Sequence, residues 1–490
     1  MNSSFSTYDW LVFGAYFLLL LVTSIILSRA KIKTSREFFV GGNSVSMLAV
    51  AISVLATSQS AATFLGAPEY SFRGDLTYLG FYLSSFLAVL FVSYVLIPRF
   101  YAIKALTVYE LLTVRYGIKA SKYVGIMFLI GRLFASGARL YIGALAISMI
   151  IFSDISTYHI AISISILMFS ALAYTYFGGV KSVILSDVIQ AITYVGAGLA
   201  VLFYLYSSLD MDFATISSKL YSEDKLKIVD FSLNGNFNIF TLFSGWLLLN
   251  IAAFGLDQDM TQRVLSCKNE KEAKKSLIYS IIFTIPVVVL FLAVGLLLYL
   301  FYQDANLTQS FQGSSVTIFM YYILNEMPDG LRGFVTVGAI AAALSSTNSV
   351  LGAMSSVAVE DIYRPWVEKH STVNDYHFVK AARVSILIFA ILLSLMAMLS
   401  FYWQQFSDLP LLSFALGVMA FSYSGLLGVY FSALFTGRGN ERTVLFALIA
   451  GFLTVLSLQP YIFGFDLGFS WQIVLGTIVS FAIMQLGNSK

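Results

Sequence analysis

Charged side chains are scarce in this sequence. Lysine, arginine, aspartate and glutamate together make up 11% of the 490 residues, whereas hydrophobic residues make up 58%. Soluble domains usually carry about 25% charged residues. The composition therefore excludes an ordinary soluble protein and predicts a polytopic membrane protein.

Reactive and metal-binding side chains are also few. The chain has one cysteine, Cys267, and three histidines, which excludes an internal disulfide and any metal or redox motif built from several cysteines. It contains no phosphate-binding loop, no dinucleotide-binding glycine pattern and no Gly-x-Ser-x-Gly motif. We therefore expect a protein that is not an enzyme.

Long apolar runs account for most of the chain and predict an all-α integral membrane protein in a single domain, residues 1–490. We identify about thirteen transmembrane helices, near residues 9–28, 45–71, 77–98, 122–150, 158–177, 186–206, 238–261, 277–301, 332–358, 377–399, 409–436, 443–458 and 468–486.

Basic residues gather in alternate loops, which sets the expected orientation. They are concentrated in the loops near 29–36, 99–122, 263–275, 364–383 and 438–442. Because loops rich in Lys and Arg stay in the cytoplasm, we expect a multi-pass protein of the plasma (inner) membrane, with its N-terminus outside and its C-terminus inside. The net charge of +3 reflects this topology and indicates no nucleic-acid partner. The long outer loops 207–237 and 302–331 are expected to form lids or short surface helices.

Four consecutive polar residues, Thr57 to Ser60, interrupt the second apolar span. In a regular helix these side chains would point to every face, including those that face lipid. The pattern therefore predicts a broken helix whose freed carbonyls line a buried site. The alternative is that the hydroxyls bond to their own helix and only bend it.

The seventh span, five spans later, carries a second polar interruption, with Asn250 followed by the Gly-Leu-Asp-Gln-Asp segment 255–259. Two broken helices at the heads of two five-helix units are typical of an inverted repeat. We expect repeats near 45–206 and 238–436, with the first span (9–28) and the last two (443–486) peripheral to them.

The ninth span contains the hydroxyl-rich segment Ser345 to Ser349 after a run of small residues. Hydroxyls and broken-helix carbonyls are hard, neutral oxygen ligands, which favour Na⁺ over Ca²⁺ or Mg²⁺. Residues 345, 348 and 349 share one helical face. The alternative is that these serines serve only helix packing.

Several ionisable residues fall within or beside predicted spans. Asp187 is either a functional carboxylate or a helix N-cap at the cytoplasmic interface. Arg132 and Arg139 share a face and meet either an anionic solute or structural partners, such as Asp187 or broken-helix carbonyls. The segment containing Asp257, Asp259 and Arg263 is interpreted as a gate or a structural ion network.

Aromatic residues in the spans offer surfaces on which a ring-shaped solute could stack. The candidates are Tyr78, Tyr82, Phe254 and Tyr423. Most Tyr and Phe residues of such a chain, however, face lipid or lie at the membrane interface.

Four segments together resemble the sodium/solute symporter family, which shares the broken-helix fold of the bacterial leucine transporter. They are Ala56-Thr57-Ser58-Gln59-Ser60, the glycine-containing segment 178–190, the segment 257–263, and the segment from Ala341 to Tyr363. The resemblance covers nearly the whole chain.

The resemblance implies two sets of ion ligands. A principal Na⁺ site would use the carbonyls of Ala56, Gln59 and Ala342 and the hydroxyls of Ser345 and Ser346. A second Na⁺ site, present in some members, would use Asp187, Ser345, Asn348 and Ser349, where Asn348 replaces a serine of the family.

The resemblance also implies solute contacts. In the sialic acid branch, residues matching Ser60 and Thr63 hold the substrate carboxylate together with an arginine, whose position is Ala135 here. Tyr82 replaces a glutamine of that branch, and the segment 135–140 is more similar to proline transporters. Asn250, Arg132 and Arg139 complete the set of substrate candidates, and a neutral or zwitterionic solute is favoured over a simple anion.

We therefore expect a Na⁺-coupled secondary active symporter that imports a small polar organic solute by alternating access. The solute class comprises sugars, sugar acids such as sialate, amino acids and monocarboxylates, and no protein partner is required. The alternatives are a proton-coupled symporter of the same fold and a membrane solute sensor. A sensor is expected to carry a signalling domain, whereas this chain ends at Lys490, directly after its last predicted span.

Overall fold

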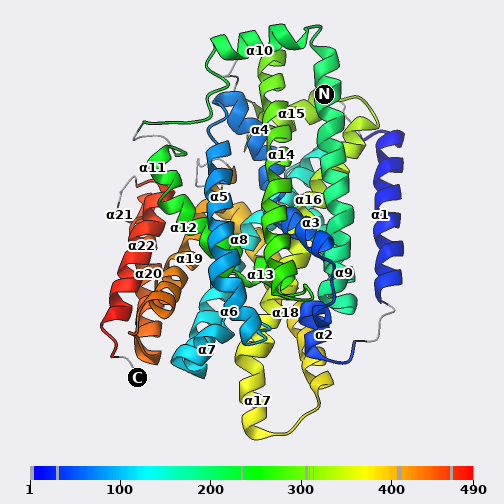
Figure 1. The fold of residues 1–490 in the computed structure, drawn as a ribbon. Helices are drawn as coiled ribbons and strands as arrows, with labels where there is room; N and C mark the ends of the chain where they lie inside the picture. The colour runs from blue at the N-terminus through cyan, green and yellow to red at the C-terminus, as the bar shows by residue number, and fades with distance from the viewer. Residues whose placement is uncertain are drawn as a thin grey trace.

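The computed structural model describes residues 5–28, 32–232, 236–303, 307, 309–312, 314–404, 411–463 and 467–488. The described chain is almost entirely helical, and its long helices stand side by side in one bundle (Figure 1). This architecture confirms the predicted all-α membrane fold.

The helices of the first half correspond to the first six predicted spans and their connections. Their bounds are α1 Thr7–Ser28, α2 Ser35–Val40, η1 Gly41–Asn43, α3 Met47–Ser58, α4 Ala61–Arg73, α5 Leu79–Phe91, η2 Val92–Leu96, α6 Ile97–Ala102, α7 Glu110–Tyr116, α8 Ile118–Phe152, α9 Thr157–Ser208 and α10 Phe213–Ser222.

The second half contains the remaining helices and one short hairpin. The bounds are α11 Ile239–Leu242, α12 Gly245–Ile251, η3 Ala252–Leu256, α13 Gln258–Val264, α14 Glu270–Tyr302, β1 Ser310–Phe311, β2 Ser314–Ser315, α15 Ile318–Asn325, α16 Leu331–Ser356, η4 Val357–Tyr363, α17 Arg364–His370, α18 Asp375–Gln404, α19 Leu411–Phe435, α20 Glu441–Ser457, α21 Pro460–Phe463 and α22 Phe469–Gln485. The strands β1 and β2 pair in an antiparallel hairpin.

Both predicted helix breaks are present. The helices α3 and α4 are bent by 64° at Gln59 and Ser60, whose backbone is extended. The second break follows η3, where Asp257 is extended and caps α13 by accepting a hydrogen bond from the Asp259 amide at 2.9 Å. The predicted boundaries of the two repeats remain a prediction.

The fifth and sixth predicted spans meet directly within α9. They join at Gly179, which has a φ of +58° and a ψ of −160°. A side chain there would place its Cβ 2.5 Å from the Phe38 carbonyl oxygen of α2. Glycine is therefore required both for the backbone conformation and for the close approach of α2.

The helix α1 stands at the edge of the bundle (Figure 1), and only 17% of its span is buried. One carboxylate fixes its first turn to the start of α16. Asp9 accepts hydrogen bonds from the amides of Gly330 at 2.8 Å and Gly333 at 2.7 Å, and it pairs with Arg332 at 2.7 Å. These contacts satisfy donors that the first turn of α16 would otherwise leave without partners.

The C-terminal helices α19, α20 and α22 pack closely through small residues. The backbones of α19 and α20 approach at Gly425 and Gly451, and Ser424 donates to the Gly451 carbonyl at 3.2 Å. Ser480 of α22 donates to the Gly425 carbonyl at 2.9 Å. Small residues and interhelical hydrogen bonds are the usual means by which helices associate in a membrane.

The long connections predicted near 207–237 and 302–331 contain short helices, as expected. The helices α10 and α15 lie at the upper end in Figure 1. The opposite end carries α2, α6, α7 and α17, together with the basic residues Arg36, Arg99 and Arg364. We call this end the basic side.

Replacing Gly451 with Ala is expected to destabilise the fold by about 1 to 3 kcal/mol, because the new Cβ would lie 2.7 Å from the Gly425 Cα. Gly14→Ala is the matched control, because a Cβ added at Gly14 of α1 would meet none of the described neighbours within 4 Å. Thermal unfolding of both purified variants tests this packing. Equal melting temperatures would contradict it.

Candidate functional site

The first break exposes the ends of two half-helices in the interior of the protein. The last turn of α3 leaves carbonyl oxygens outside the helical ladder, and the first turn of α4 leaves amides outside it. Gln59 and Ser60 lie between the two helices and are 3% and 5% exposed. A carbonyl end attracts a cation and an amide end attracts an anionic group, so the break presents both kinds of site.

The hydroxyls of α16 reach the carbonyl end of α3. Ser345 donates to the Ala56 carbonyl at 2.8 Å and lies 3.2 Å from the Ala342 carbonyl. Ser346, on the same helix, bonds to the Ala343 carbonyl at 3.0 Å. The structure thus brings Ala56, Ala342 and Ser345 together, with Ser346 on the next position of α16.

A second group of oxygens lies on α9 and α16. Asp187 and Asn348 are both fully buried, and the Oδ1 atom of each has no hydrogen-bond partner among the described residues. Asn348 donates weakly to Ser186 at 3.4 Å, and Ser349 bonds to the Ser346 carbonyl at 2.9 Å. Buried polar atoms without partners usually mark a water or an ion that binds there. These atoms fit a monovalent cation.

The described residues do not form the kind of carboxylate cluster that usually binds a divalent cation. In the part of the chain that the structure describes, no three Asp, Glu, His or Cys side chains come together as metal ligands. The candidate ligands at the first break are neutral oxygens, which suit a monovalent ion.

A buried ion network joins the second broken helix to the rest of the bundle. Arg132 of α8 pairs with Asp257 at 2.7 Å and with Asp259 at 2.8 Å. Arg263 of α13 pairs with Asp259 at 3.1 Å and with Asp187 at 3.2 Å. All five side chains are at most 3% exposed. The expected ion network at 257–263 is therefore present and extends into α8 and α9.

Asp187 is not a helix N-cap, so this alternative was wrong. It lies within α9, eight residues after the bend at Gly179, and its Oδ2 accepts hydrogen bonds from Ser53 and Arg263. The sequence placed a helix start near Ser186 because Ser and Asp are preferred at helix N-caps. Asp187 was also expected as a possible partner of Arg132 or Arg139. It pairs with Arg263 instead.

The remaining substrate candidates come from several helices of the bundle, namely α4, α5, α8, α12, η3 and α19, with Ser60 directly before α4 and Tyr78 directly before α5. Tyr78 and Tyr82 contact each other edge to face with ring centroids 5.6 Å apart. Arg139 is close enough to Tyr78 and Tyr423 to act on them electrostatically. Every candidate except Arg139 is buried, namely Ser60, Thr63, Tyr78, Tyr82, Arg132, Asn250, Phe254 and Tyr423. Tyr423 also donates a hydrogen bond to Asp257, which links this region to the ion network.

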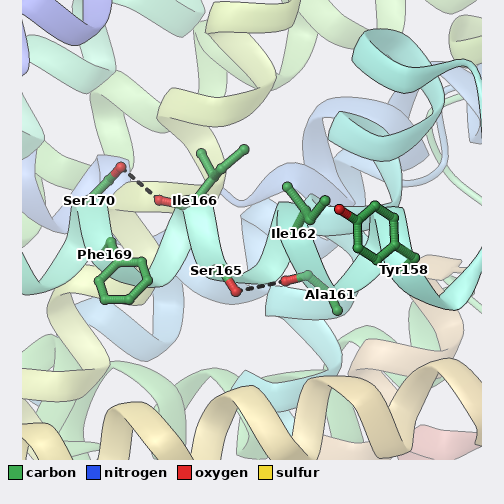
Figure 2. Close-up of a pocket in the computed structure, with 7 residues that line it drawn as sticks. All are labelled: Tyr158, Ala161, Ile162, Ser165, Ile166, Phe169 and Ser170. Carbon is green, nitrogen blue, oxygen red and sulfur yellow. Dashed lines mark hydrogen bonds between the residues drawn. The ribbon is translucent and has the colours of Figure 1, made fainter.

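Two cavities differ in their chemistry. A small enclosed space between α8, α16 and α18 is lined by Arg132, Ser136, Arg139, Ser346 and Thr347, and its volume of about 10 Å³ leaves room for roughly one water molecule. Figure 2 shows a larger, open hollow of about 480 Å³ on one face of α9. Its lining is mainly apolar, and the hydroxyls of Ser165 and Ser170 bond to carbonyls of their own helix. Apart from the Tyr158 hydroxyl, the described lining of the larger hollow offers no polar side-chain group that is not already bonded to its own helix.

Some residues of the site gave no signal in the sequence. Ser53 lies in an apolar run, yet its hydroxyl bonds to Asp187 at 2.5 Å and accepts from Arg263 at 2.9 Å. Gln258 lies at the start of α13, and its contacts with other elements involve residues about 100 to 150 positions away. Such long-range partners cannot be found from helical periodicity.

A comparison with protein families decides the identity. The family model described as "Sodium:solute symporter family" matches residues 38–451. The chain belongs to the sodium:solute symporter family. It is accordingly a Na⁺-coupled secondary active transporter, a multi-pass membrane protein and not an enzyme, as the sequence predicted.

Relatives of this symporter share about a quarter of its residues. The sodium/sialic acid symporter SiaT of Proteus mirabilis is 27% identical over 480 residues, covering 97% of this chain and 93% of that protein. The sodium-coupled monocarboxylate transporter 1 of Xenopus laevis is 28% identical over 379 residues, covering 75% of this chain and 59% of that longer protein.

Solved structures agree on the fold of the symporter. The substrate-bound, outward-open state of a Na⁺-coupled sialic acid symporter superposes with a TM-score of 0.83 at 24% identity, covering 99% of this chain and 98% of that one. The closed form of the nucleobase-cation-symport transporter Mhp1 gives a TM-score of 0.57 at 13% identity, covering 92% of this chain and 93% of that one. Both likenesses support the predicted leucine-transporter-like fold with its broken helices.

Replacing Arg132 with Gln is expected to destabilise the symporter by about 3 to 5 kcal/mol, because Asp257 and Asp259 would stay buried with less compensating charge. Lys119→Gln is the control on the same helix, since Lys119 pairs with Glu441 at the surface. The thermal stability of both variants in detergent checks the expectation. Wild-type stability of Arg132→Gln together with weakened solute binding would instead make Arg132 a solute ligand.

Proposed function

We propose that this symporter imports a small polar solute that carries a carboxylate, together with Na⁺ bound between the first break and α16. The observation that carries the proposal is the contact between the Ser345 hydroxyl and the free Ala56 carbonyl in the buried centre of the protein. The carbonyl end of a broken helix and a facing hydroxyl are what a monovalent cation requires.

The principal ion site is assigned to neutral oxygens. The proposed ligands are the carbonyls of Ala56, Gln59 and Ala342 and the hydroxyls of Ser345 and Ser346. Gln59 has an extended backbone between the two half-helices, so its carbonyl takes no part in either helical ladder. The end of the α3 dipole adds partial negative charge at the same point.

A second ion is assigned to Asp187, Ser345, Asn348 and Ser349. The support is the pair of partnerless Oδ1 atoms on Asp187 and Asn348. Arg263 and Ser53 bond to Oδ2 of Asp187, which leaves Oδ1 for the ion. Because each Na⁺ contributes about 2.3 kcal/mol per 100 mV of membrane potential, two ions would concentrate the solute much further than one.

The solute is assigned to the amide end of α4 and the side chains around it. Ser60 precedes the first turn of α4 without making a side-chain cap, so amides of that turn are open to a ligand. Helix N-termini bind anionic groups, which favours amino acids, sugar acids and monocarboxylates over plain sugars, in place of the preference for a neutral solute drawn from the sequence. The names of the relatives, which specify sialic acid and monocarboxylates, agree with such a solute. The proposed contacts are Ser60, Thr63, Tyr78, Tyr82, Arg139, Asn250, Phe254 and Tyr423.

The symporter is assigned to the plasma membrane. Its basic side is assigned to the cytoplasm and its N-terminus to the outside. The excess of Lys and Arg in the loops of that side supports this orientation.

Coupling of Na⁺ to the solute follows from one shared conformational equilibrium. Na⁺ that joins α3 to α16 favours one arrangement of the break, and the solute binds to that arrangement.

The defining experiment is a solute screen on the purified symporter. Thermal shifts are measured with carboxylates, amino acids, sugar acids and neutral sugars, in NaCl and in choline chloride. We expect a carboxylate-bearing solute to stabilise the protein only in Na⁺. Solute-induced stabilisation of equal size in choline, with uptake driven by a pH gradient, would favour the proton-coupled alternative.

Replacing Ser345 and Ser346 with Ala is expected to raise the Na⁺ concentration for half-maximal uptake by about tenfold or more, because two ion ligands are lost, whereas insertion is retained. The matched control is Thr336→Ala with Ser355→Ala, which removes two other buried α16 hydroxyls that bond to carbonyls. Na⁺-dependent uptake in proteoliposomes compares the two double variants. An unchanged Na⁺ requirement in the Ser345/Ser346 variant would remove the first site.

Replacing Asp187 with Asn keeps the shape of the side chain and removes its charge. If Asp187 holds a second ion, the Hill coefficient for Na⁺ falls from near two to near one. Because the change also weakens the contact with Arg263, folded yield is measured in parallel. A wild-type Hill coefficient already near one would contradict the second site.

A further inference from the structure

The connection between α6 and α7 is clamped across the basic side of the bundle. Gln258 of α13 accepts from the Val108 amide at 3.0 Å and donates to the Leu106 carbonyl at 2.9 Å. The same side chain donates to Ser356 of α16 at 3.1 Å, and Tyr430 of α19 donates to the Val108 carbonyl at 2.8 Å. All five residues except Leu106 are fully buried, so this clamp closes the basic side around them.

One acidic side chain is enclosed by the clamp. Asp361 lies in the π-helical segment η4 and is 3% exposed. Its Oδ1 accepts a hydrogen bond from the Thr107 hydroxyl at 2.9 Å, and its Oδ2 has no partner among the described residues. Gly125 of α8 packs against the same residue, because a Cβ added there would lie 3.6 Å from the Asp361 Cβ. Thr107 belongs to the clamped connection, so the clamp also holds the hydroxyl that bonds to Asp361.

Asp361 differs from the other buried aspartates in lacking a cation. Asp9, Asp187, Asp257 and Asp259 each have a guanidinium nitrogen within 3.2 Å. No Lys, Arg or His nitrogen lies within 4.0 Å of Asp361 in the described ranges. An ionised carboxylate with one hydroxyl donor and no cation is costly in such a place, and the neutral acid is not.

The groups around Asp361 add to this cost. Among the described residues, the carboxylates of Glu110 on α7 and Glu360 on η4 act on Asp361 electrostatically, and both carry charge of the same sign. Two buried phenols, Tyr109 and Tyr430, are near enough to interact with Asp361 electrostatically, but their hydroxyls donate to the carbonyls of Leu256 and Val108. Arg364, three residues further along the chain, pairs instead with Glu360, Glu368 and Asp375. On α2, Arg36 acts on Glu110.

We propose that Asp361 is a proton-binding site that is filled while the basic side is closed and emptied when that side opens. Opening separates Thr107 from η4 and admits water, and the carboxylic acid then releases its proton to the cytoplasm. Closing takes one proton back from the same compartment. The proton therefore makes no net crossing, and the Na⁺ stoichiometry is unchanged.

The direction of the pH effect follows from this proton count. The closed form binds one proton more than the open form, so acid favours closing and a rise in cytoplasmic pH opposes it. Where the closed and open forms differ by a whole proton, the ratio of closed to open forms falls about tenfold for each unit by which the pH rises. The inference takes alternating access and the orientation of the basic side from the proposed function.

Infrared difference spectroscopy tests the protonation directly and needs no solute. The spectrum of the wild type minus that of Asp361→Asn, both in NaCl at pH 8, is expected to contain the C=O stretch of a protonated carboxylic acid. Asn resembles the neutral acid in shape and can still accept from Thr107. Glu360→Gln is the matched control, and it should keep the band because Glu360 pairs with Arg364. A wild-type carboxylate signal in place of the acid band would overturn the proposal.

Thr107→Val keeps the test decisive if Asp361→Asn does not fold. Removing the hydroxyl that donates to Asp361 should move the acid band of the wild type to higher frequency, because a less strongly bonded carbonyl is stiffer. An acid band that does not move belongs to another residue and contradicts the assignment.

The second readout is the pH profile of transport, with equal pH on both sides of proteoliposomes. Using the solute selected by the Na⁺-dependent screen, we expect the uptake rate to fall by up to about tenfold per pH unit above pH 7 in the wild type and in Glu360→Gln. The profile of Asp361→Asn should be flat over this range. A purely structural role would lower the rate of Asp361→Asn at every pH and leave the profile sloped.

Discussion

The break between α3 and α4 is the constraint on which the rest of the structure depends. A helix interrupted at membrane depth leaves carbonyls and amides that lipid cannot satisfy, so the protein must enclose them. The helix α16 meets this need because its small residues allow close packing. Ala343 lies against Gly143 of α8, and Gly338 lies against Ala197 of α9. This close approach brings Ser345 within 2.8 Å of the Ala56 carbonyl. The same geometry that stabilises the break also provides oxygens for a cation.

The buried ion network gives the second break an equivalent enclosure. Asp257 caps α13 and pairs with Arg132 of α8, and Arg263 of α13 pairs with Asp187 of α9. Arg263 also reaches Ser53 of α3, so the network extends to the helix that ends at the first break. The two discontinuous helices are thus connected through charged side chains. Asp187 belongs both to this network and to the proposed second ion site, so its contacts reach Ser53 of α3 and Arg263 of α13.

Much of this fold follows from the sequence because its causes are local. The polar run at Thr57 to Ser60 and the segment around Asp257 predicted the two breaks, since polar residues in a row cannot all avoid lipid. The partners were not predictable in the same way. Periodicity places Arg132 and Arg139 on one face of α8, but it does not say that Asp257 and Asp259, more than a hundred residues later, meet the first of them. The helix start expected near Ser186 was wrong because the turn at Gly179 needs no loop. The isolation of Asp361 depends on which elements surround it, so only the structure shows it.

The most direct test of the account is equilibrium binding of ²²Na⁺ to the purified symporter without solute. The wild type and Ser345→Ala are compared in choline chloride at constant ionic strength, with Ser355→Ala as the control from the same helix. The account predicts saturable binding to the wild type and to Ser355→Ala, and a large loss of affinity in Ser345→Ala. Binding of the same affinity and stoichiometry in all three proteins would contradict an ion held at the break.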